Sequence, residues 1–256
     1  MESGKAVVTG PDTWSVQGRT IQLPVVIPAA RAAAALFAAP AGGARHLLAG
    51  TGLVPVTVAG RAAGVLLLAS YDEFALGSYD EVGVGVLARG PGRRLGLHLV
   101  DLPVTGSLTC AAGRDIWALP KWLMTGAVTF SERAAALSVV GGGTPAVAGV
   151  VPARGLRVPV PLRVTGPVWC LLDRGQRAGE LLRGAVSLRL SGLRVGRGQA
   201  RLELGPHPMA ARMRALGMAR RPMLTVHVRH LSGEIGSFRT TRLVATPADG
   251  DGGSDG

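Results

Sequence analysis

Short apolar stretches separated by glycine and proline recur along most of the chain and predict many short β-strands. Residues 82–88 show the pattern well, because Val82, Val84 and Val86 alternate with other residues, as in a strand with one buried face. Gly141-Gly142-Gly143 lies between two such stretches and predicts a hairpin turn. The other predicted strands are 20–27, 53–58, 63–70, 94–102, 127–130, 135–140, 146–151, 164–172, 184–193, 200–204 and 223–230.

Two segments predict short helices. Residues 30–39 are rich in alanine, follow a proline and end at Pro40. Residues 207–217 carry Pro208 in the first turn and Gly217 at the C-terminal end, with Met209 and Met213 on one face. Strands do not alternate with helices, so the pattern predicts a mainly β fold with a few short helices (α+β), as a closed barrel or stacked antiparallel sheets.

The chain has 256 residues, enough to bury a substantial core in one domain. We expect an irregular N-terminal segment over 1–19 and a single domain over 20–246. The remaining residues, 247–256, are acidic and rich in glycine, which predicts a disordered tail.

Composition excludes several classes of protein. No apolar run reaches the ~20 residues of a membrane-spanning helix, and the polar start of the chain does not read as a secretory signal, so we expect no membrane association. Cys110 and Cys170 lie among apolar residues and predict two buried thiols rather than a disulfide. These features favour a cytoplasmic protein.

The net charge of +12 raises the possibility of nucleic-acid binding, but its distribution argues against it. Arginines are spread through the second half of the chain, and no aromatic residues are interleaved with them for base stacking. We therefore expect a solvated basic surface and no nucleic-acid partner. The five histidines show no metal-ligand spacing on one strand face, which predicts no metal site.

The scarcity of lysine is more informative than the charge. Among 28 basic residues only Lys5 and Lys121 are lysine. A desolvated lysine can lose its proton near neutral pH, whereas arginine cannot.

The segment 111–124 places Lys121 directly after Pro120 and among apolar residues that include Trp117 and Trp122. If these neighbours exclude water in the fold, the neutral amine that attacks carbonyl groups is favoured. The alternative is a lysine on a surface turn, with its stem on apolar neighbours and its charge in water. The residues alone leave both possibilities open.

A family resemblance favours the first possibility. The stretch from Gly113 to Lys121, Gly-Arg-Asp-Ile-Trp-Ala-Leu-Pro-Lys, resembles the active-site segment of the acetoacetate decarboxylase superfamily. The stretch from Gly77 to Gly83 resembles that family's segment bearing an active-site glutamate. The resemblance implies a β-barrel flanked by antiparallel sheet, a homo-oligomer, and no cofactor. It also implies that Lys121 is the Schiff-base lysine and Glu81 the pocket carboxylate.

The implied substrate is a small keto acid or a related carbonyl compound. Lys121 would form an iminium with its ketone, and the loss of carbon dioxide would follow in a β-keto acid. Aldolase or dehydratase relatives would use the same intermediate for carbon–carbon bond formation or loss of water. The expected pocket residues are Arg114, Trp117, Trp122 and Leu66, with Arg114 also positioning the loop.

The sequence departs from the family pattern at three positions. Trp122 replaces a second lysine, while Ala29 and Leu66 align with a family arginine and a family glutamate; Arg31 is close to the first of these. These departures argue against acetoacetate itself and favour a larger or less charged keto substrate. They also leave open an inactive member of the family that only binds a small molecule.

Overall fold

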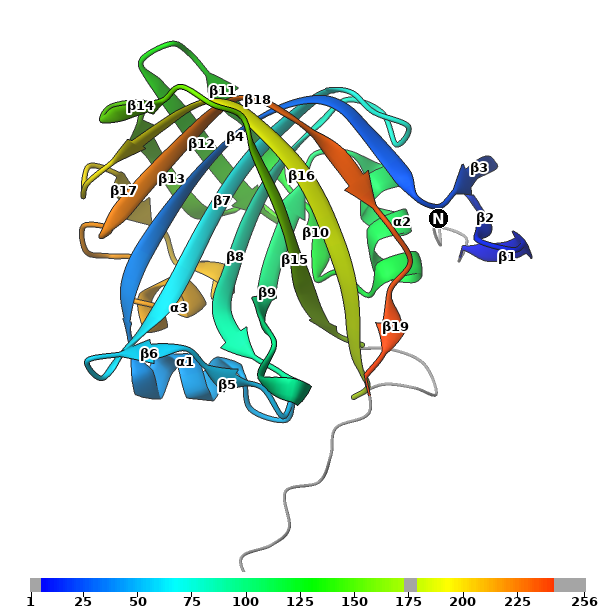
Figure 1. Ribbon diagram of the computed structural model, residues 1–256, viewed down its shortest axis with the longest axis horizontal. Coiled ribbons are helices and arrows are strands. Elements are labelled where there is room, and N and C mark those ends of the chain that lie inside the picture. The colour runs from blue at the N-terminus through cyan, green and yellow to red at the C-terminus, as the bar shows by residue number, and fades with distance from the viewer. Residues whose placement is uncertain (1–5, 173–178, 242–256) are drawn as a thin grey trace, which may run out of the picture.

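The computed structural model describes residues 6–172 and 179–241, and seven antiparallel and parallel strands close into a β-barrel (Figure 1). The strands follow the order β9-β15-β16-β18-β4-β7-β8, and pairing of β8 with β9 closes the ring. The bounds are β4 (Val25–Pro40), β7 (Arg61–Glu73), β8 (Tyr79–Arg89), β9 (Leu95–Val104), β15 (Leu162–Leu171), β16 (Leu181–Gly196) and β18 (Leu224–Ile235). Short strands extend it: β5 (Val54–Pro55), β6 (Thr57–Val58), β10 (Lys121–Leu123), β14 (Leu156–Val158) and β19 (Arg239–Thr240).

Two smaller sheets flank the barrel. One is the antiparallel sheet of β11 (Thr125–Phe130), β12 (Ala134–Gly141), β13 (Thr144–Pro152) and β17 (Arg201–Leu204). The other is the N-terminal sheet of β1 (Val7–Gly10), β2 (Thr13–Val16) and β3 (Arg19–Gln22).

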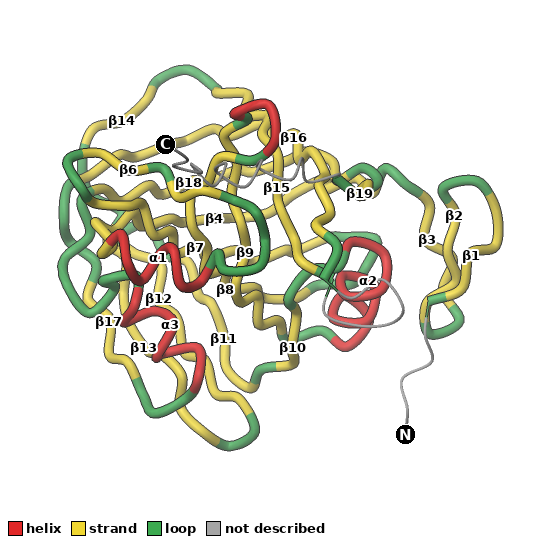
Figure 2. Tube along the Cα trace, turned by 90° about the horizontal axis from the view of Figure 1, so that it is seen from below, coloured by secondary structure: helices red, strands yellow, loops and turns green. Residues whose placement is uncertain are grey.

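The described residues form three α-helices, α1 (Ala41–Leu47), α2 (Ser107–Trp117) and α3 (Pro208–Ala215), and a 3₁₀ turn over Pro91–Arg93. Figure 2 shows α1 and α3 together near β13 and β17, whereas α2 lies at the other side of the molecule, between β10 and the N-terminal sheet. The helices therefore cover two separate parts of the barrel wall.

The predicted fold class is confirmed, because the described residues form mostly strands with a few short helices. The predicted helix over 30–39 is wrong: these residues belong to β4, which pairs along its length with β7 and β18. Alanine has a high helix propensity, but here alternate residues of the strand are buried and both of its edges pair with neighbouring strands, so tertiary packing overrides the propensity.

The helix predicted at 207–217 is confirmed as α3, while α1 and α2 were not predicted. The irregular segment expected over 1–19 is also wrong for its described part, since β1 and β2 and the start of β3 fall within it. The predicted disordered tail lies outside the described residues, and the domain boundaries remain predictions.

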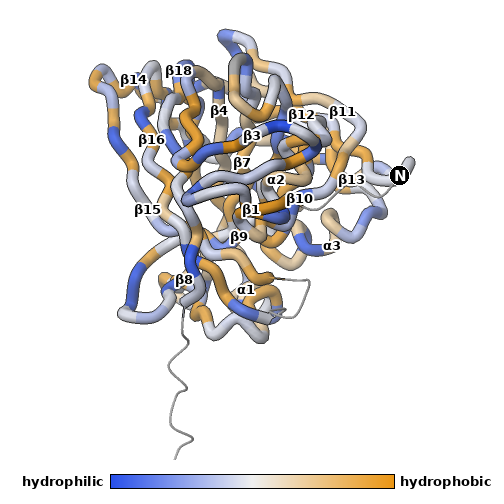
Figure 3. Tube along the Cα trace, turned by 90° about the vertical axis from the view of Figure 1, so that its right-hand side faces the viewer, coloured by the Kyte–Doolittle hydropathy of each residue, from blue (hydrophilic) through white to orange (hydrophobic). Residues whose placement is uncertain are grey.

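Successive residues on the barrel strands face opposite sides, and the two sides are packed differently. On β7 and β8 the paired residues Leu66 and Val84, and likewise Leu68 and Val82, are fully buried in the main core. That core lies between the outer barrel wall, the β11–β12–β13–β17 sheet, α1 and α3. Figure 3 shows the corresponding alternation of hydrophobic and hydrophilic residues along β15 and β16.

Two local predictions are confirmed. Gly142 and Gly143 form the turn between β12 and β13, each with a positive φ (54° and 81°) that disfavours other residues. Cys110 and Cys170 are free, buried thiols.

His98 on β9 makes the stability of the fold depend on pH. Its ring is buried, with Nδ1 3.2 Å from the carbonyl oxygen of Trp169, and burial lowers the pKa of His98 to about 4. Between pH 6.5 and about 4 the unfolded chain binds this proton and the folded chain does not. We expect the free energy of unfolding to fall by about 3 kcal/mol as the pH is lowered through this range. Urea titrations of the wild type and of His98→Asn test this, since the variant should lose most of the dependence.

Candidate active site

Lys121 lies four residues after the C-terminal end of α2 and is the first residue of β10. Ala118 adopts the left-handed conformation (φ 53°) that ends the helix, and the Leu119 amide donates a hydrogen bond to the carbonyl of Gly113. The chain then turns through Pro120 into β10, which pairs in parallel with β9 so that Lys121 lies beside Leu102. The position of the Lys121 backbone is thus fixed by the end of α2 before it and by the strand pairing of β10 with β9.

The amine of Lys121 lies inside the protein. Its side chain is 4% exposed, and Nζ is 2.8 Å from the Glu81 carboxylate and donates a hydrogen bond of 2.8 Å to Thr109 Oγ1. Nζ also lies 5.1 Å from the centre of the Tyr79 ring. The structure therefore excludes the surface lysine and places the amine in direct contact with a carboxylate and a hydroxyl.

Glycine is required one turn along α2 from Thr109. A Cβ atom on Gly113 would lie 2.4 Å from Cδ of Lys121, closer than van der Waals contact allows. Thr109 and Gly113 are four residues apart and so share one face of the helix. There Thr109 accepts a hydrogen bond from the amine, and Gly113 leaves room for the aliphatic part of the lysine side chain. This packing explains the glycine that precedes Arg114.

Two tyrosines complete the surroundings of Glu81. The Tyr71 hydroxyl donates to Glu81 Oε1 at 3.3 Å, and the Tyr71 and Tyr79 rings stack with centroids 4.5 Å apart. Burial, and then the negative charge of Glu81, raise the pKa of both tyrosines well above the usual value. Both hydroxyls therefore stay protonated at neutral pH, and the charge at the site is that of the Lys121–Glu81 pair.

Among the residues predicted for the site, the structure brings Lys121 and Glu81 together. Leu66 lies on the opposite face of the sheet, because Glu81 pairs with Ala69 while Leu66 faces the main core. Arg31 is also on that opposite face, where it pairs with Asp72 at 2.7 Å. Ala29 is exposed. Neither position supplies a cation to the amine.

The remaining predicted residues lie around the site rather than at the amine. Trp117 is buried against the N-terminal sheet and donates its indole N–H to the Gly236 carbonyl at 2.8 Å. Arg114 follows Gly113 on α2, and its Nη2 atom is buried without a hydrogen-bond partner among the described residues. Its role in substrate binding stays a prediction.

Trp122 points away from Lys121, as expected for the next residue of a strand. Its indole N–H donates to Asp101 Oδ1 at 3.2 Å, and its ring lies 4.9 Å from that of His207. Asp101 is 2% exposed and is held by Arg212 of α3 through two bonds of 2.5 and 2.6 Å. This network anchors β10 to β9 and α3, so Trp122 acts on the position of the lysine and does not contact its amine.

Sequence reasoning missed Thr109, Tyr71 and Tyr79. Thr109 could have been found from its four-residue spacing to Gly113 if α2 had been predicted. The tyrosines could have been noticed because they are as rare as lysine: the chain contains only two, and both lie at this site.

We expect Thr109→Val to remove one hydrogen bond of the Lys121 amine while its contact with Glu81 remains. The valine has nearly the same shape but cannot accept the hydrogen bond, so a buried ammonium donor loses a partner. The free energy of unfolding should fall by about 1.5–3 kcal/mol, as for other hydrogen bonds to charged groups. Denaturant titration measures the change, and Thr109→Ser is the matched control that keeps the acceptor.

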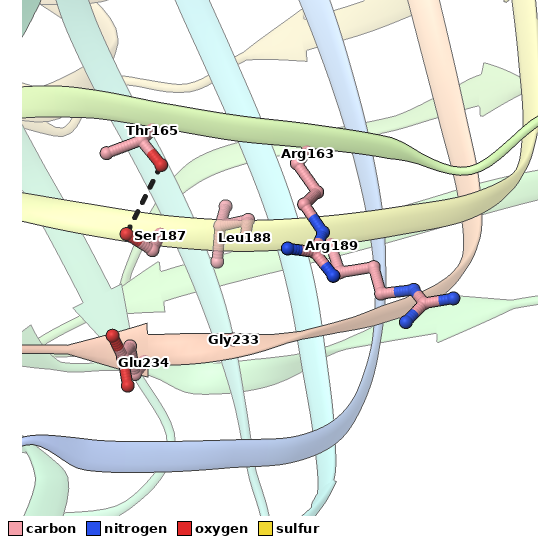
Figure 4. Close-up of a pocket in the computed structure, with 7 residues that line it drawn as sticks. All are labelled: Arg163, Thr165, Ser187, Leu188, Arg189, Gly233 and Glu234. Carbon is pink, nitrogen blue, oxygen red and sulfur yellow. Dashed lines mark hydrogen bonds between the residues drawn. The ribbon is translucent and has the colours of Figure 1, made fainter.

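Three surface hollows of about 410, 790 and 170 Å³ lie elsewhere. The first two are lined mainly by β15 and β16, and the third by β4, β16 and β18, including Ala30 and Leu231. Figure 4 shows the first, where Arg163 and Arg189 lie beside the hydrogen-bonded hydroxyls of Thr165 and Ser187. Lys121 and Glu81 line none of the three.

Over residues 6–172 and 179–241, no three histidine, cysteine, aspartate or glutamate side chains are grouped as a metal site requires. Within the same residues, no helix is long and apolar enough to cross a bilayer.

Comparison with known proteins places this geometry in context. A family model described as acetoacetate decarboxylase matches residues 15–233. A search of curated protein sequences finds no match. A structure from structural studies of acetoacetate decarboxylase aligns with a TM-score of 0.70 and 14% identity, covering 86% of this chain and 90% of that chain.

Two further solved structures are similar. Acetoacetate decarboxylase from Legionella pneumophila has a TM-score of 0.66 and 13% identity, with 94% of this chain and 93% of that chain covered. The enduracididine biosynthesis enzyme MppR, complexed with pyruvate, has a TM-score of 0.67 and 16% identity, with 86% and 91% covered. At these identities the structural likeness shows the fold alone.

Proposed function

The chain belongs to the acetoacetate decarboxylase family, and from this premise we propose that it is a cofactor-independent, Schiff-base-forming lyase acting on a β-keto acid through Lys121. The observation that carries the proposal is the buried amine of Lys121 within 2.8 Å of Glu81. A sequestered amine beside a carboxylate has both the nucleophile and the proton acceptor that imine formation requires.

Glu81 first takes a proton from the Lys121 ammonium across their 2.8 Å contact. The neutral amine then attacks the ketone carbon and forms a carbinolamine. Glu81 returns its proton to the carbinolamine hydroxyl, which leaves as water and yields the iminium. The positive charge thus moves from the ammonium to the iminium and stays beside the Glu81 carboxylate.

The iminium next accepts the electron pair of the bond between the α-carbon and the carboxylate. Carbon dioxide leaves, and the remaining enamine takes a proton from solvent at the α-carbon. Water then hydrolyses the resulting iminium to a ketone and restores the ammonium. Thr109 and Tyr71 serve as positioning residues here, because they hold Lys121 Nζ and Glu81 Oε1 respectively.

Aldolase or dehydratase chemistry is the second candidate, since the same iminium can form a new carbon–carbon bond or lose water. MppR has been solved with pyruvate and with the condensation product of pyruvate and imidazole 4-carboxaldehyde. That carbonyl chemistry, on the same fold, favours this alternative. An inactive binding member is a third candidate, favoured by the lack of a cation from Ala29 or Arg31 at the amine.

Borohydride reduction in the presence of a panel of keto acids and ketones tests the proposal. We expect a covalent mass gain equal to the reduced imine, and peptide mapping should assign it to Lys121, because Lys5 is the only other lysine. Carbon dioxide release from the same panel separates decarboxylation from aldol or dehydratase chemistry. Absence of any adduct across the panel would leave the binding member as the better account.

Glu81→Gln is expected to slow imine formation by a factor of about 10²–10⁴, the usual contribution of a positioned proton acceptor. The amide keeps the shape of the side chain but takes no proton from the ammonium. The rate of borohydride-trapped adduct formation at fixed ketone concentration measures the effect. Glu132→Gln is the matched control, since that carboxylate is exposed and pairs with Arg229; equal rates for both variants would remove Glu81 from the mechanism.

We further propose that the protein is a cytoplasmic homo-oligomer. Light scattering coupled to size-exclusion chromatography tests the oligomeric state.

A further inference from the structure

The inner face of the barrel differs from its packed outer face. Here we define lumen-facing residues as those that alternate with the main-core residues on the barrel strands and share the face of Glu81. On β7 these include Leu67, Ala69 and Tyr71, which are half-buried, whereas the intervening Leu66 and Leu68 are at most 1% exposed. Solvent therefore reaches the lumen-facing side of the barrel at these three positions.

Strand pairing defines one continuous row of lumen-facing residues that begins at the proposed site. Tyr71, whose hydroxyl contacts Glu81, pairs with Ala30. Ala30 pairs with Leu231, Leu231 with Leu190, and Leu190 with Leu162. The row crosses β7, β4, β18, β16 and β15 without a polar side chain after the tyrosine hydroxyl.

The row runs from the tyrosine that contacts Glu81, through two buried residues, to the partly exposed Leu162. Ala30 is 3% and Leu231 8% exposed, whereas Leu162 at the far end is 39% exposed. Tyr71 and Leu190 pack against the same apolar cluster, which includes Ala30 and Leu231. Away from the strand ends, Glu81 and Lys121 are the charged side chains among the described lumen-facing residues.

From this row we infer that the substrate carries an extended apolar substituent, which lies along the lumen from Tyr71 toward Leu162 while its keto group meets Lys121. This inference rests on the proposed function and assigns its substrate class. The substrate is a β-keto acid whose keto carbon carries an aliphatic or aromatic chain rather than a single methyl group. An apolar chain gains from leaving water here, and a charged chain would find no partner.

A series of methyl ketones tests the inference, because they are the products of such β-keto acids and form the same imine. Acetone, 2-hexanone and 2-octanone are each titrated under borohydride, and the half-saturating concentration for adduct on Lys121 is measured. We expect it to fall about fourfold per added methylene, the gain from burying one such group. A half-saturating concentration that stays constant or rises with chain length overturns the inference and leaves the Schiff-base proposal standing.

Binding of dodecanoate, which has no ketone, tests the lumen site independently of the Schiff-base proposal. Calorimetry should detect its binding to the wild type even if no ketone forms an adduct. In that case the lumen site holds and the Schiff-base chemistry fails; absence of dodecanoate binding together with absence of chain-length dependence rejects the lumen site.

Leu190→Gln is expected to abolish most of the chain-length dependence by placing an amide in the row. Arg189→Gln is the matched control, because the neighbouring residue of the same strand faces the outer surface (Figure 4). If Leu190→Gln does not fold, Leu162→Gln serves the same purpose at the partly exposed end of the row. Equal chain-length dependence in the wild type and in the folded row variant would also overturn the inference.

Discussion

Lys121→Arg is expected to lose the borohydride-trapped adduct completely while the protein remains folded. The guanidinium keeps a positive charge beside Glu81, but it does not deprotonate near neutral pH and cannot form the imine. Intact-mass measurement after borohydride treatment with the best ketone of the panel tests this, with circular dichroism as the check on folding.

Lys5→Arg provides the matched control, since it removes the other lysine and should leave the adduct unchanged. Lys121→Met complements it by removing the charge, and the unpaired Glu81 should lower the stability of that variant. An adduct that survives in Lys121→Arg and disappears in Lys5→Arg would refute the assignment of the nucleophile.

Arg212→Met is expected to produce the largest loss of stability among the substitutions considered. Among the described residues it leaves the Asp101 carboxylate, which is 2% exposed, with only the Trp122 indole as hydrogen-bond partner. Removing one partner of a buried ion pair typically costs about 3–5 kcal/mol. The Arg212 side chain is 36% exposed, so we expect about 2–4 kcal/mol, measured by urea denaturation.

A double-mutant cycle identifies the cause of this loss. Asp101→Asn combined with Arg212→Met should be more stable than Arg212→Met alone, because the buried charge is gone. Adduct formation at Lys121 should slow in Arg212→Met, since β10 loses an anchor. A change in unfolding free energy below about 1 kcal/mol for Arg212→Met would show that the carboxylate finds another partner.

Much of the fold, and the pairing of the two central residues of the candidate site, could be predicted from the sequence. Strands such as β8 have an alternating pattern that depends only on local residues, so they are visible without knowledge of the fold. Lys121 stands out because a chain rich in arginine keeps so few lysines, and Glu81 was reached through the family resemblance.

Other features depend on contacts between distant segments and could not be predicted. β4 has the composition of a helix, and only its pairing with β7 and β18 makes it a strand. The face on which Leu66 lies follows from the register of β7 against β8, which the sequence does not specify. The sequence neighbours of Trp122 predict a place in the pocket, but the strand geometry of β10 turns its side chain toward Asp101.

The alternation of packed and half-buried positions along β7 bears on how this protein could be re-engineered. A mutant library at Leu67 and Ala69 changes side chains that contact the lumen, so it should yield enzymes with altered preferences and near-native melting temperatures. A library at Leu66 and Leu68 disturbs the close-packed core and should yield mostly insoluble variants. On this one strand, Leu67 and Ala69 can thus be changed to alter substrate preference, whereas the alternating Leu66 and Leu68 must be kept to preserve the fold.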